Sequence, residues 1–540
     1  MVARVKMEPC PAKTATRQQG RKVKQKRGYQ QCFLHIACGL ALLLACPLQG
    51  YSASNDPEQE IRRSLGKITK VYRMLETHLA DPVDPEQTLY EGAIRGALSR
   101  LDPFSVFLNE QQFAMFQQQQ RGVQQGFGAI LNVQSGSVMV LQAIPGAPFS
   151  RAGLGPGDRI ARINGHWVAA MDLPQLVEVL QEARSSRVKL SVIRSGKVVA
   201  EEFDLDPTEV PQPTVDKKFL LQPQVGYLHV SGIEQGTPKE IDDTLNEWKG
   251  QQLRGLILDL RDNPGGALDA AVSIAGLFLE KGQLVTSLQG RALPEKKYFV
   301  TSSPPWPDLP LVVLVNEATA SAAEIIAAAL QEHDRAWLVG SETFGKGVVE
   351  SVLPLSQGAA LVLTVAQYFT PQGASVQKAL PGTALAGILE KGTRQFFSDQ
   401  GRPLGRNGGV QPDEKADSWQ LDSWARFVQQ SSAFINFAQT YLDRHGQVEE
   451  DFLVEEPVLE DFRNFLRRAG LRVPPESWER SRPFVRTRIQ TELFNLTFGI
   501  SRGDEIEIRA DPQVQAGRLS LSKASQLLAG RGQAPMPGGQ

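Results

Sequence analysis

Hydrophobic and polar residues follow different periods along the chain, and each period predicts a different kind of domain. Apolar residues at helical spacing, among them Ile61, Leu65 and Ile68, predict helices in the N-terminal part. Between residues 122 and 205, short apolar strands separated by glycine-rich turns predict a compact β-rich module. Between residues 214 and 380, apolar strands alternate with helices, which is typical of an α/β domain.

The segments between these regions predict the domain boundaries. Residues 207–213 form a proline-bearing linker, and the Gln-rich tract 111–125 is predicted to be a connection. Residues 381–409 form a polar, Gly-rich excursion, and the chain ends in a Gly/Pro-rich tail that we expect to be disordered. We predict a leader at 1–53, a helical region at 54–118, a β-rich module at 119–206, an α/β core at 207–413 and a helical region at 414–540.

The charge distribution sets the first residues of the chain apart. Residues 1–28 contain nine Lys or Arg and one Glu, whereas the formal net charge of the whole chain is −1. An apolar run at 32–46 follows, which has the length of a signal-peptide hydrophobic region and is short for a membrane span. We predict an exported protein, with cleavage near Ala53 or lipidation of Cys46; an uncleaved amphiphilic anchor is the alternative.

Cysteine and histidine usage limits the chemistry. All four cysteines lie in or before the apolar run, so the mature chain has no internal disulfide, catalytic cysteine or thiolate metal site. The six histidines form no ligand-like pair, and we predict neither a metal nor another cofactor. The charge balance predicts no nucleic-acid partner.

Ser321 is the candidate nucleophile. It lies in Asn316-Glu-Ala-Thr-Ala-Ser321, between a predicted apolar strand and an alanine-rich helix. Free backbone N–H groups at the start of a helix stabilise developing negative charge, which suits a hydroxyl that attacks a carbonyl. The same stretch, continued to Glu324, also fits an ordinary helix capping box.

Lys346 is the candidate base, 25 residues after Ser321 in Gly345-Lys-Gly347. A right-handed crossover places the next parallel strand beside the first, which would return Lys346 toward Ser321. A desolvated, neutral lysine can take the proton of a serine hydroxyl, so this pair would make a serine hydrolase that needs no histidine. The alternative is a solvated loop lysine.

A glycine-rich turn follows a predicted buried strand, in Arg261-Asp-Asn-Pro-Gly-Gly266. Its glycines would let a backbone N–H approach a tetrahedral oxyanion, together with the N–H of Ala322. A simple turn explains the same residues equally well.

Together these motifs resemble those of the carboxyl-terminal processing peptidases, also called tail-specific proteases. The matching stretches follow the family's order: Leu101-Asp-Pro-Phe-Ser105, Gly126-Phe-Gly-Ala129, residues 151–165, residues 258–266, residues 319–325, residues 339–347, residues 368–373 and Gly409-Val-Gln-Pro-Asp413. The resemblance implies a crotonase/ClpP-like α/β protease core with an inserted β-rich PDZ domain and helical N- and C-terminal regions.

The resemblance also implies roles for individual residues. Ser321 would be the nucleophile and Lys346 the general base, and the N–H groups of Ala322 and of Gly266 or Gly265 would bind the oxyanion. The loop residues Gly126, Phe127, Gly128 and Ala129 of the PDZ domain would bind the terminal carboxylate of a substrate and accommodate its last side chain. The implied partners are proteins or peptides with a free C-terminus, a second copy of the chain, a regulatory adaptor, and the membrane through the leader.

The sequence departs from the family at a position next to the candidate base. The family usually has glutamine four residues after the lysine, whereas this chain has Glu350. An ionised carboxylate favours the protonated lysine, which cannot act as a base. We therefore predict that Glu350 is protonated by burial or that activity shifts to alkaline pH. Smaller departures are Ala323, where the family often has serine, and Ala374, where it often has arginine.

The resulting functional prediction is a serine endopeptidase that cleaves near the C-terminus of exported proteins, in a bacterial periplasm or, alternatively, an organellar lumen. A catalytically weak PDZ adaptor that binds tails is a second hypothesis, which only Glu350 favours. A third, an acyl-CoA enzyme on a crotonase-like core, is opposed by the PDZ-like module and the Ser/Lys pair.

Overall fold

The computed structural model describes residues 2–3, 57–120, 123–194, 196–221, 224–383, 395–405 and 408–531 of the chain. Most of the predicted leader, including Cys46 and Ala53, lies outside these residues, as do the end of the C-terminal tail and part of the 381–409 excursion. Contacts divide the chain into a small unit, residues 5–90, and a large unit formed by residues 1–4 and 91–540. Among the described residues, no helix combines the length and apolar character needed to cross a membrane.

The small unit contains helix α1 (Pro57–His78), which the helical spacing of its apolar residues predicted. These side chains are exposed: Ile61 retains 58% of its accessible surface and Leu65 retains 56%. A six-residue π-helix, Glu86–Glu91, leads into the large unit. The large unit begins with α2 (Gly92–Leu98), β2 (Val106–Leu108), α3 (Glu110–Gln120) and β3 (Val123–Gly126).

Helix α3 corrects the prediction for the Gln-rich tract 111–125. The tract is mostly helix and then strand, whereas we expected a connection. Glutamine is a good helix former, but a run of it gives no apolar stripe from which a helix could be recognised. The proline-bearing linker also contains a strand, β10 (Thr208–Pro211), which pairs antiparallel with β3.

The β-rich module is a single sheet with strand order β4-β5-β6-β8-β9, with β7 added to β6 and a two-residue strand β1 (Val2–Ala3) parallel to β4. Asn164 and Gly165 both have positive φ in the tight turn between β6 and β7, as the Asn-Gly pair predicts. The other elements are β4 (Ala129–Gln134), β5 (Ser137–Ala143), α4 (Pro148–Arg151), β6 (Arg159–Ile163), β7 (His166–Trp167), α5 (Leu173–Ala183), β8 (Val188–Ile193) and β9 (Ala200–Leu205).

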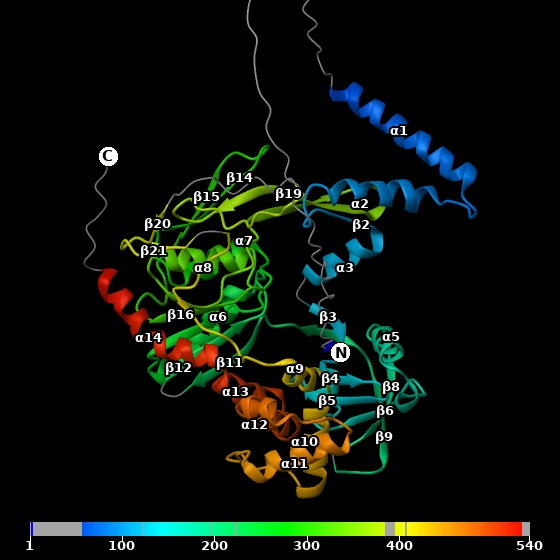
Figure 1. The fold of residues 1–540 in the computed structure, drawn as a ribbon, viewed down its shortest axis with the longest axis vertical. Helices are drawn as coiled ribbons and strands as arrows, with labels where there is room; N and C mark the ends of the chain where they lie inside the picture. Colours follow the sequence, from blue (N-terminus) through cyan, green and yellow to red (C-terminus); the bar gives the residue numbers. More distant parts are fainter. Residues whose placement is uncertain are drawn as a thin grey trace, which may run out of the picture. The chain divides into compact units, whose positions relative to one another are not determined.

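The α/β core is built on a six-stranded sheet with order β11-β12-β13-β16-β17-β22. Figure 1 labels β11, β12 and β16 of this sheet. All neighbours from β12 to β22 pair parallel, and β11 pairs antiparallel with β12 at the edge. The strands are β11 (Val215–Leu221), β12 (Val225–Val230), β13 (Gly255–Asp259), β16 (Leu311–Val315), β17 (Trp337–Gly340) and β22 (Glu414–Lys415). The core helices are α6 (Thr237–Glu247), α7 (Leu268–Gly276) and α8 (Ala322–Glu332).

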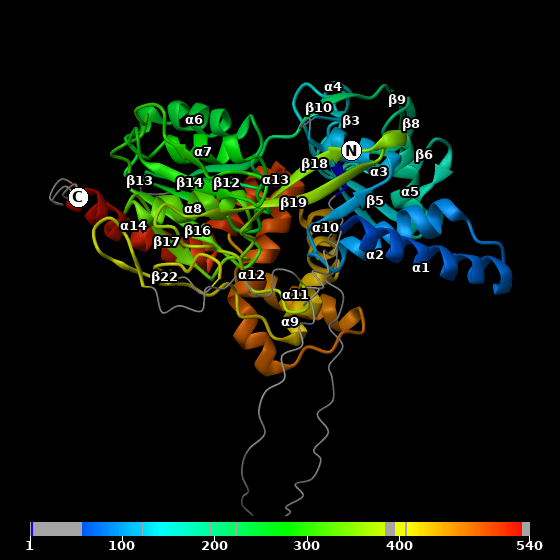
Figure 2. The same cartoon turned by 90° about the horizontal axis from the view of Figure 1, so that it is seen from above.

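Both faces of this sheet are buried, with alternate residues facing opposite layers. In β13, Leu256 and Leu258 pack in one hydrophobic cluster with α6, α7 and α8. Ile257 packs in a second cluster with Val514 and Ala524 of α14 (Pro512–Arg531). Helix α14 is therefore a layer of the α/β core, on the far side of the sheet from α6 and α7 (Figure 2).

A second sheet with order β15-β14-β19-β18 continues the core, with β2 paired to β19. Its strands are β14 (Leu284–Gln289), β15 (Lys296–Phe299), β18 (Val348–Pro354) and β19 (Ala360–Phe369). Two short strands, β20 (Phe396–Phe397) and β21 (Pro403–Leu404), pair within the Gly-rich excursion.

The C-terminal helices have a separate, aromatic hydrophobic cluster. Stacked and edge-to-face rings join its members, for example Phe434 and Phe462 with centroids 4.9 Å apart. These helices are α9 (Ser423–Gln430), α10 (Ala433–His445), α11 (Glu456–Arg468), α12 (Pro475–Phe498) and α13 (Ile500–Ala510). The predictions of an α/β core, a β-rich module and helical regions are thus confirmed.

Candidate active site

Ser321 lies in the turn that joins the buried strand β16 to helix α8. Its backbone has φ 56° and ψ −119°, a strained conformation for a residue with a side chain. Thr319 fixes the turn, because its hydroxyl donates to the carbonyl of Leu260 at 2.8 Å and accepts from the N–H of Asn316 at 2.9 Å. The contact with Leu260, which follows β13, therefore stabilises the turn in which Ser321 adopts this strained backbone conformation.

Lys346 lies in the turn between β17 and β18. The N–H of Phe344 in this turn donates to the carbonyl of Thr319 at 2.9 Å, which ties it to the turn that contains Ser321. Gly345 has φ 87°, and a Cβ there would lie 2.4 Å from the Lys378 side chain, so only glycine fits.

The Glu324 carboxylate joins the two turns from within the core. One oxygen, Oε2, accepts the N–H of Ser321 and the N–H of Lys346, each at 2.9 Å. The other oxygen, Oε1, accepts the N–H of Gly345 at 2.8 Å and the hydroxyl of Thr343 at 2.5 Å. Since all four partners are donors, the site requires a carboxylate with both oxygens free to accept.

Tyr368 joins the same two turns through their carbonyl groups. Its hydroxyl lies 3.1 Å from the carbonyl oxygen of Ser321 and 2.7 Å from that of Lys346. The ring is almost completely buried, at 1% exposed surface. Burial raises the pKa of the Tyr368 hydroxyl well above 10, and the nearby carboxylates of Glu324 and Glu350 raise it further, so the group remains a donor.

Glu324 is fully buried. Among the described residues, no Lys, Arg or His side chain forms an ion pair with it. Burial raises its pKa to about 7, although its hydrogen bonds from Thr343, Lys346, Gly345 and Ser321 act in the opposite direction. The carboxylate that joins the two turns is therefore sensitive to pH near neutrality.

The ammonium nitrogen of Lys346 is paired with a carboxylate. Its Nζ lies 2.6 Å from Glu350 Oε1, with 22% and 18% of the two side chains exposed. The contact is an ion pair without hydrogen-bond geometry. The ring of Phe104 lies beneath the nitrogen, with its centroid 4.9 Å away. Among the described residues, no hydrogen bond links Lys346 Nζ to the Ser321 hydroxyl.

The glycine-rich loop lies against Ser321. A Cβ on Gly265 would lie 2.8 Å from both the Ser321 Cβ and the backbone nitrogen of Ala322. The N–H of Gly265 donates to Asn263 Oδ1 at 2.8 Å and is therefore occupied. The N–H groups of Gly266 and Ala322 have no acceptor among the described residues.

The predicted PDZ loop links β3 to β4. Phe127 is completely buried in the core of the module, and its ring centroid lies 6.4 Å from that of Phe149. A Cβ on Gly128, which has φ 68°, would lie 2.1 Å from the Ala147 Cβ. The N–H groups of Phe127 and Gly128 have no acceptor among the described residues, whereas their carbonyl groups accept from Phe149 and Ile144.

Comparison with known proteins shows what these parts are. The model of peptidase family S41 matches residues 224–384, that of a PDZ domain matches residues 139–194, and that of the activating protease CtpB N-terminal domain matches residues 46–112. A carboxy-terminal-processing protease of Bartonella bacilliformis is 30% identical over 349 residues, which are 64% of this chain and 80% of that protein.

The chain belongs to peptidase family S41. A carboxyl-terminal-processing protease of Synechocystis is 34% identical over 309 residues, 56% of this chain and 72% of that protein. The solved structure of a photosystem II D1 C-terminal processing protease is 26% identical and overlaps 64% of this chain and 86% of that one, with a TM-score of 0.35 that adds no structural argument. These matches identify a serine-type carboxyl-terminal processing peptidase with a PDZ domain.

Sequence reasoning missed two residues at this site of the processing peptidase. Glu324 was considered only as a helix cap, and Tyr368 was part of a matching stretch without a role. A capping box uses the same spacing as the bridge that Glu324 makes to Ser321, and the bonds to Gly345 and Lys346 depend on tertiary structure. No local signal distinguishes the two cases.

Proposed function

We propose that the chain is an endopeptidase in which Ser321 is the nucleophile and Lys346 the general base, and which cleaves exported proteins near a C-terminus that the PDZ domain binds. One observation supports the dyad most directly: a single oxygen of Glu324 accepts the backbone N–H groups of both residues at 2.9 Å. The hydroxyl of Tyr368 binds both carbonyl groups. Two turns that are distant in sequence are thereby held together.

The proposed reaction is an acyl transfer in two stages. Neutral Lys346 takes the proton of the Ser321 hydroxyl while the oxygen attacks the scissile carbonyl carbon. The resulting ammonium gives the proton to the leaving amine as the C–N bond breaks. Water then attacks the acyl ester with Lys346 again as base, which releases the new carboxylate and restores Ser321.

We assign the oxyanion donors to Gly266 and Ala322. Both N–H groups are without acceptors among the described residues, and Ala322 begins α8, where the helix dipole favours negative charge. We prefer Gly266 to Gly265 as the donor, because Asn263 Oδ1 accepts the N–H of Gly265. Its role is steric, since a side chain there would collide with Ser321.

Lys346 must lose its proton to act as a base, although it is paired with the Glu350 carboxylate. The ion pair and the ring of Phe104 both stabilise the ammonium form of a lysine. Transfer of one proton from the ammonium to the carboxylate gives a neutral amine and a neutral acid without uptake of a proton from solution. Substrate that excludes water from Lys346 and Glu350 favours this neutral pair. The alternative is loss of a proton to solvent at alkaline pH.

The PDZ loop is proposed to bind the substrate tail. The N–H groups of Phe127 and Gly128 are available for a terminal carboxylate, with Gly126 and Ala129 at the ends of the flanking strands. The buried ring of Phe127 supports the loop from the module core. We also propose the crotonase/ClpP-like arrangement of the protease core and export by the leader.

Cleavage of an unfolded protein with an apolar C-terminal tail tests this function. We expect tail-dependent cleavage by the wild type and none by Ser321→Ala or Lys346→Ala. Lys218→Ala is the matched control, because Lys218 forms an exposed ion pair with Glu247 in the same core at 3.0 Å. Cleavage that persists in Ser321→Ala would contradict the dyad, and tail binding without cleavage at any pH would favour the adaptor.

Glu350→Gln tests the neutral pair separately, with Glu247→Gln as control. If the pair shares a proton in the active form, Glu350→Gln removes the internal proton acceptor, so Lys346 must lose its proton to solvent and activity shifts to higher pH. If Lys346 already loses its proton to solvent in the wild type, loss of the carboxylate extends activity to lower pH. An unchanged profile between pH 6 and pH 10 would contradict any role of Glu350 in setting the charge of Lys346.

A further inference from the structure

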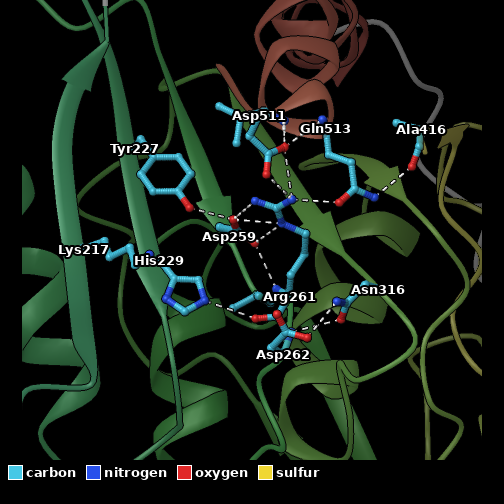
Figure 3. Close-up of polar contacts among 12 residues, drawn as sticks. Lys217, Tyr227, His229, Asp259, Arg261, Asp262, Asn316, Ala416, Asp511 and Gln513 are labelled. Carbon is cyan, nitrogen blue, oxygen red and sulfur yellow. Dashed lines mark hydrogen bonds and ion pairs between the residues drawn. The ribbon is translucent and has the colours of Figure 1, made fainter. Parts of the chain in front are cut away.

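Arg261 begins the glycine-rich loop 261–266, and its side chain, of which 12% is exposed, lies between groups from distant segments (Figure 3). Its Nε and Nη2 donate to the Asp259 carboxylate at 2.6–3.0 Å. Its Nη1 donates to Asp511 Oδ2 at 3.0 Å and to Gln513 Oε1 at 2.7 Å. Asp511 and Gln513 lie 250 and 252 residues later, at the start of α14.

Both acceptors from α14 are themselves fixed. Asp511 Oδ1 accepts the N–H groups of Gln513 and Val514 at 2.8 and 3.0 Å and so caps the helix. Gln513 Nε2 donates to the carbonyl of Ala416 at 2.8 Å, which orients its amide oxygen toward Arg261. With α14 packed on the core sheet, these groups form a preorganised site for one guanidinium.

Short contacts lead from Arg261 to the catalytic groups. The next residue, Asp262, exchanges two hydrogen bonds with the Asn316 side chain at 2.9 and 3.0 Å, and Asn316 begins the turn that contains Ser321 (Figure 3). The carbonyl of Asn263 accepts the N–H of Ala320 at 2.9 Å. Its Oδ1 accepts the N–H of Gly265. The glycine-rich loop therefore contacts the turn that contains Ser321 through both Asp262 and Asn263.

We propose, on the basis of the function proposed above, that Asp511 and Gln513 are positioning residues for the cleavage reaction. They hold Arg261, and through it they set the position of the Gly266 N–H relative to Ser321. The physical reason is the steep dependence of oxyanion stabilisation on donor position, since a displacement of about 1 Å lowers a rate by about 100-fold. The C-terminal helix therefore contributes to catalysis without contact with substrate.

Asp511→Asn in the full chain tests the proposal. Asparagine keeps an oxygen that can cap α14 but removes the charge that faces Arg261. Asp504→Asn is the matched control: Asp504 lies on α13 and pairs with Lys217 at 3.0 Å, with 13% and 16% of the side chains exposed. Within the described part of the chain, the ion pairs of Arg261 are with Asp259 and Asp511. We expect kcat for a tailed protein to fall about tenfold in Asp511→Asn and to stay unchanged in Asp504→Asn, with KM unchanged in both.

A double-mutant cycle shows whether Asp511 acts through Arg261. In an Arg261→Lys background, Asp511→Asn is expected to cause no further loss of kcat. Equal effects of Asp511→Asn and Asp504→Asn, additive effects in the cycle, or a change in KM alone would overturn the proposal. These results differ from failure of the proposed function, which is shown by cleavage in Ser321→Ala whatever the result for Asp511.

Discussion

Asp259 and Glu324 are both buried carboxylates beside the proposed catalytic groups, but Asp259 is paired with a cation whereas Glu324 is bound by uncharged donors. Asp259 is 1% exposed and is paired with the guanidinium of Arg261. Burial acts to raise its pKa, but Arg261, with help from His229 and the Tyr227 hydroxyl, holds the pKa below its usual value. Glu324 is fully buried and is held by uncharged donors, and its pKa is raised to about 7.

This difference separates a structural carboxylate from a pH-sensitive one. The ion pair with Arg261 holds the pKa of Asp259 below its usual value, so this carboxylate keeps its charge near neutrality, where Glu324 changes its own. Dipolar donors fix the position of Glu324 but leave its charge open to change near neutrality. We therefore expect substitution of Asp259 to lower mainly the free energy of unfolding, and substitution of Glu324 to lower mainly kcat.

The largest expected effect is on stability, in Asp259→Asn. The substitution leaves the Arg261 guanidinium buried with Asp511 and Gln513 as its remaining acceptors. Breaking a buried ion pair from one side costs about 3–5 kcal/mol in the free energy of unfolding. Denaturant unfolding measures this loss, with Asp216→Asn, at a more exposed carboxylate, as a control. A loss below about 1 kcal/mol would contradict the structural role of Asp259.

The next largest effect is on activity, in Glu324→Gln. The amide group of glutamine would face backbone N–H groups that need acceptors, so one of the two turns must move. We expect kcat to fall by about 100-fold or more, as for loss of an oxyanion donor, with a smaller loss of stability than in Asp259→Asn. Glu332→Gln is the matched control, at a fully buried position on the same helix. Equal kcat values in the two variants would refute the bridge.

A pH titration sharpens the same comparison. Since the pKa of Glu324 is about 7 in the fold and 4.5 without it, the carboxylate takes up a proton as the pH falls through 7. Between pH 8 and pH 6, kcat should fall about tenfold.

The free energy of unfolding depends on pH in the opposite direction to kcat, because the folded state binds this proton more tightly than the unfolded chain. The contribution of Glu324 to stability is therefore full below pH 4.5 and is lost as the pH rises through about 7. Activity should fall in acid before any unfolding, as kcat and the unfolding midpoint measured on the same samples would show. Loss of activity that coincides with unfolding would contradict this account.

The smallest expected effect is in Tyr368→Phe. The variant removes the hydroxyl that binds the carbonyl groups of Ser321 and Lys346 but keeps the buried ring. Since the Glu324 bridge remains, we expect kcat to fall only about fivefold, in line with one neutral hydrogen bond of about 1 kcal/mol. Tyr298→Phe, at a partly buried ring of the same sheet, is the control. A loss as large as that of Glu324→Gln would make Tyr368 the principal link.

Elements with clear apolar periodicity could be predicted from the sequence. Helix α5 and strand β8 lie in the predicted β-rich module, and strands β16 and β17 lie in the predicted α/β domain. The predicted helical region 54–118 covers most of helix α3, but its Gln-rich tract gives no apolar stripe and therefore also predicted a connection. The place of α14 in the protease core could not be predicted, because its burial of Val514 and Ala524 depends on a sheet formed far earlier in the chain.

The site could be predicted in part, through motifs rather than through spacing. The sequence indicated Ser321 and Lys346 as candidates and named Gly266, or alternatively Gly265, as an oxyanion donor. The choice between the glycines depends on the Asn263 side chain, which occupies one N–H. The bridge by Glu324 and the contact of Arg261 with Asp511 join segments that no local pattern connects.

Covalent labelling with a fluorophosphonate tests the central claim, the Ser321/Lys346 dyad, most directly. The reagent is attacked by an activated serine, and mass spectrometry of the digested protein identifies the labelled residue. We predict that Ser321 is the only residue labelled in the wild type and that labelling stops in Lys346→Ala but continues in Lys218→Ala. Labelling of another serine, or an undiminished rate in Lys346→Ala, would contradict the account.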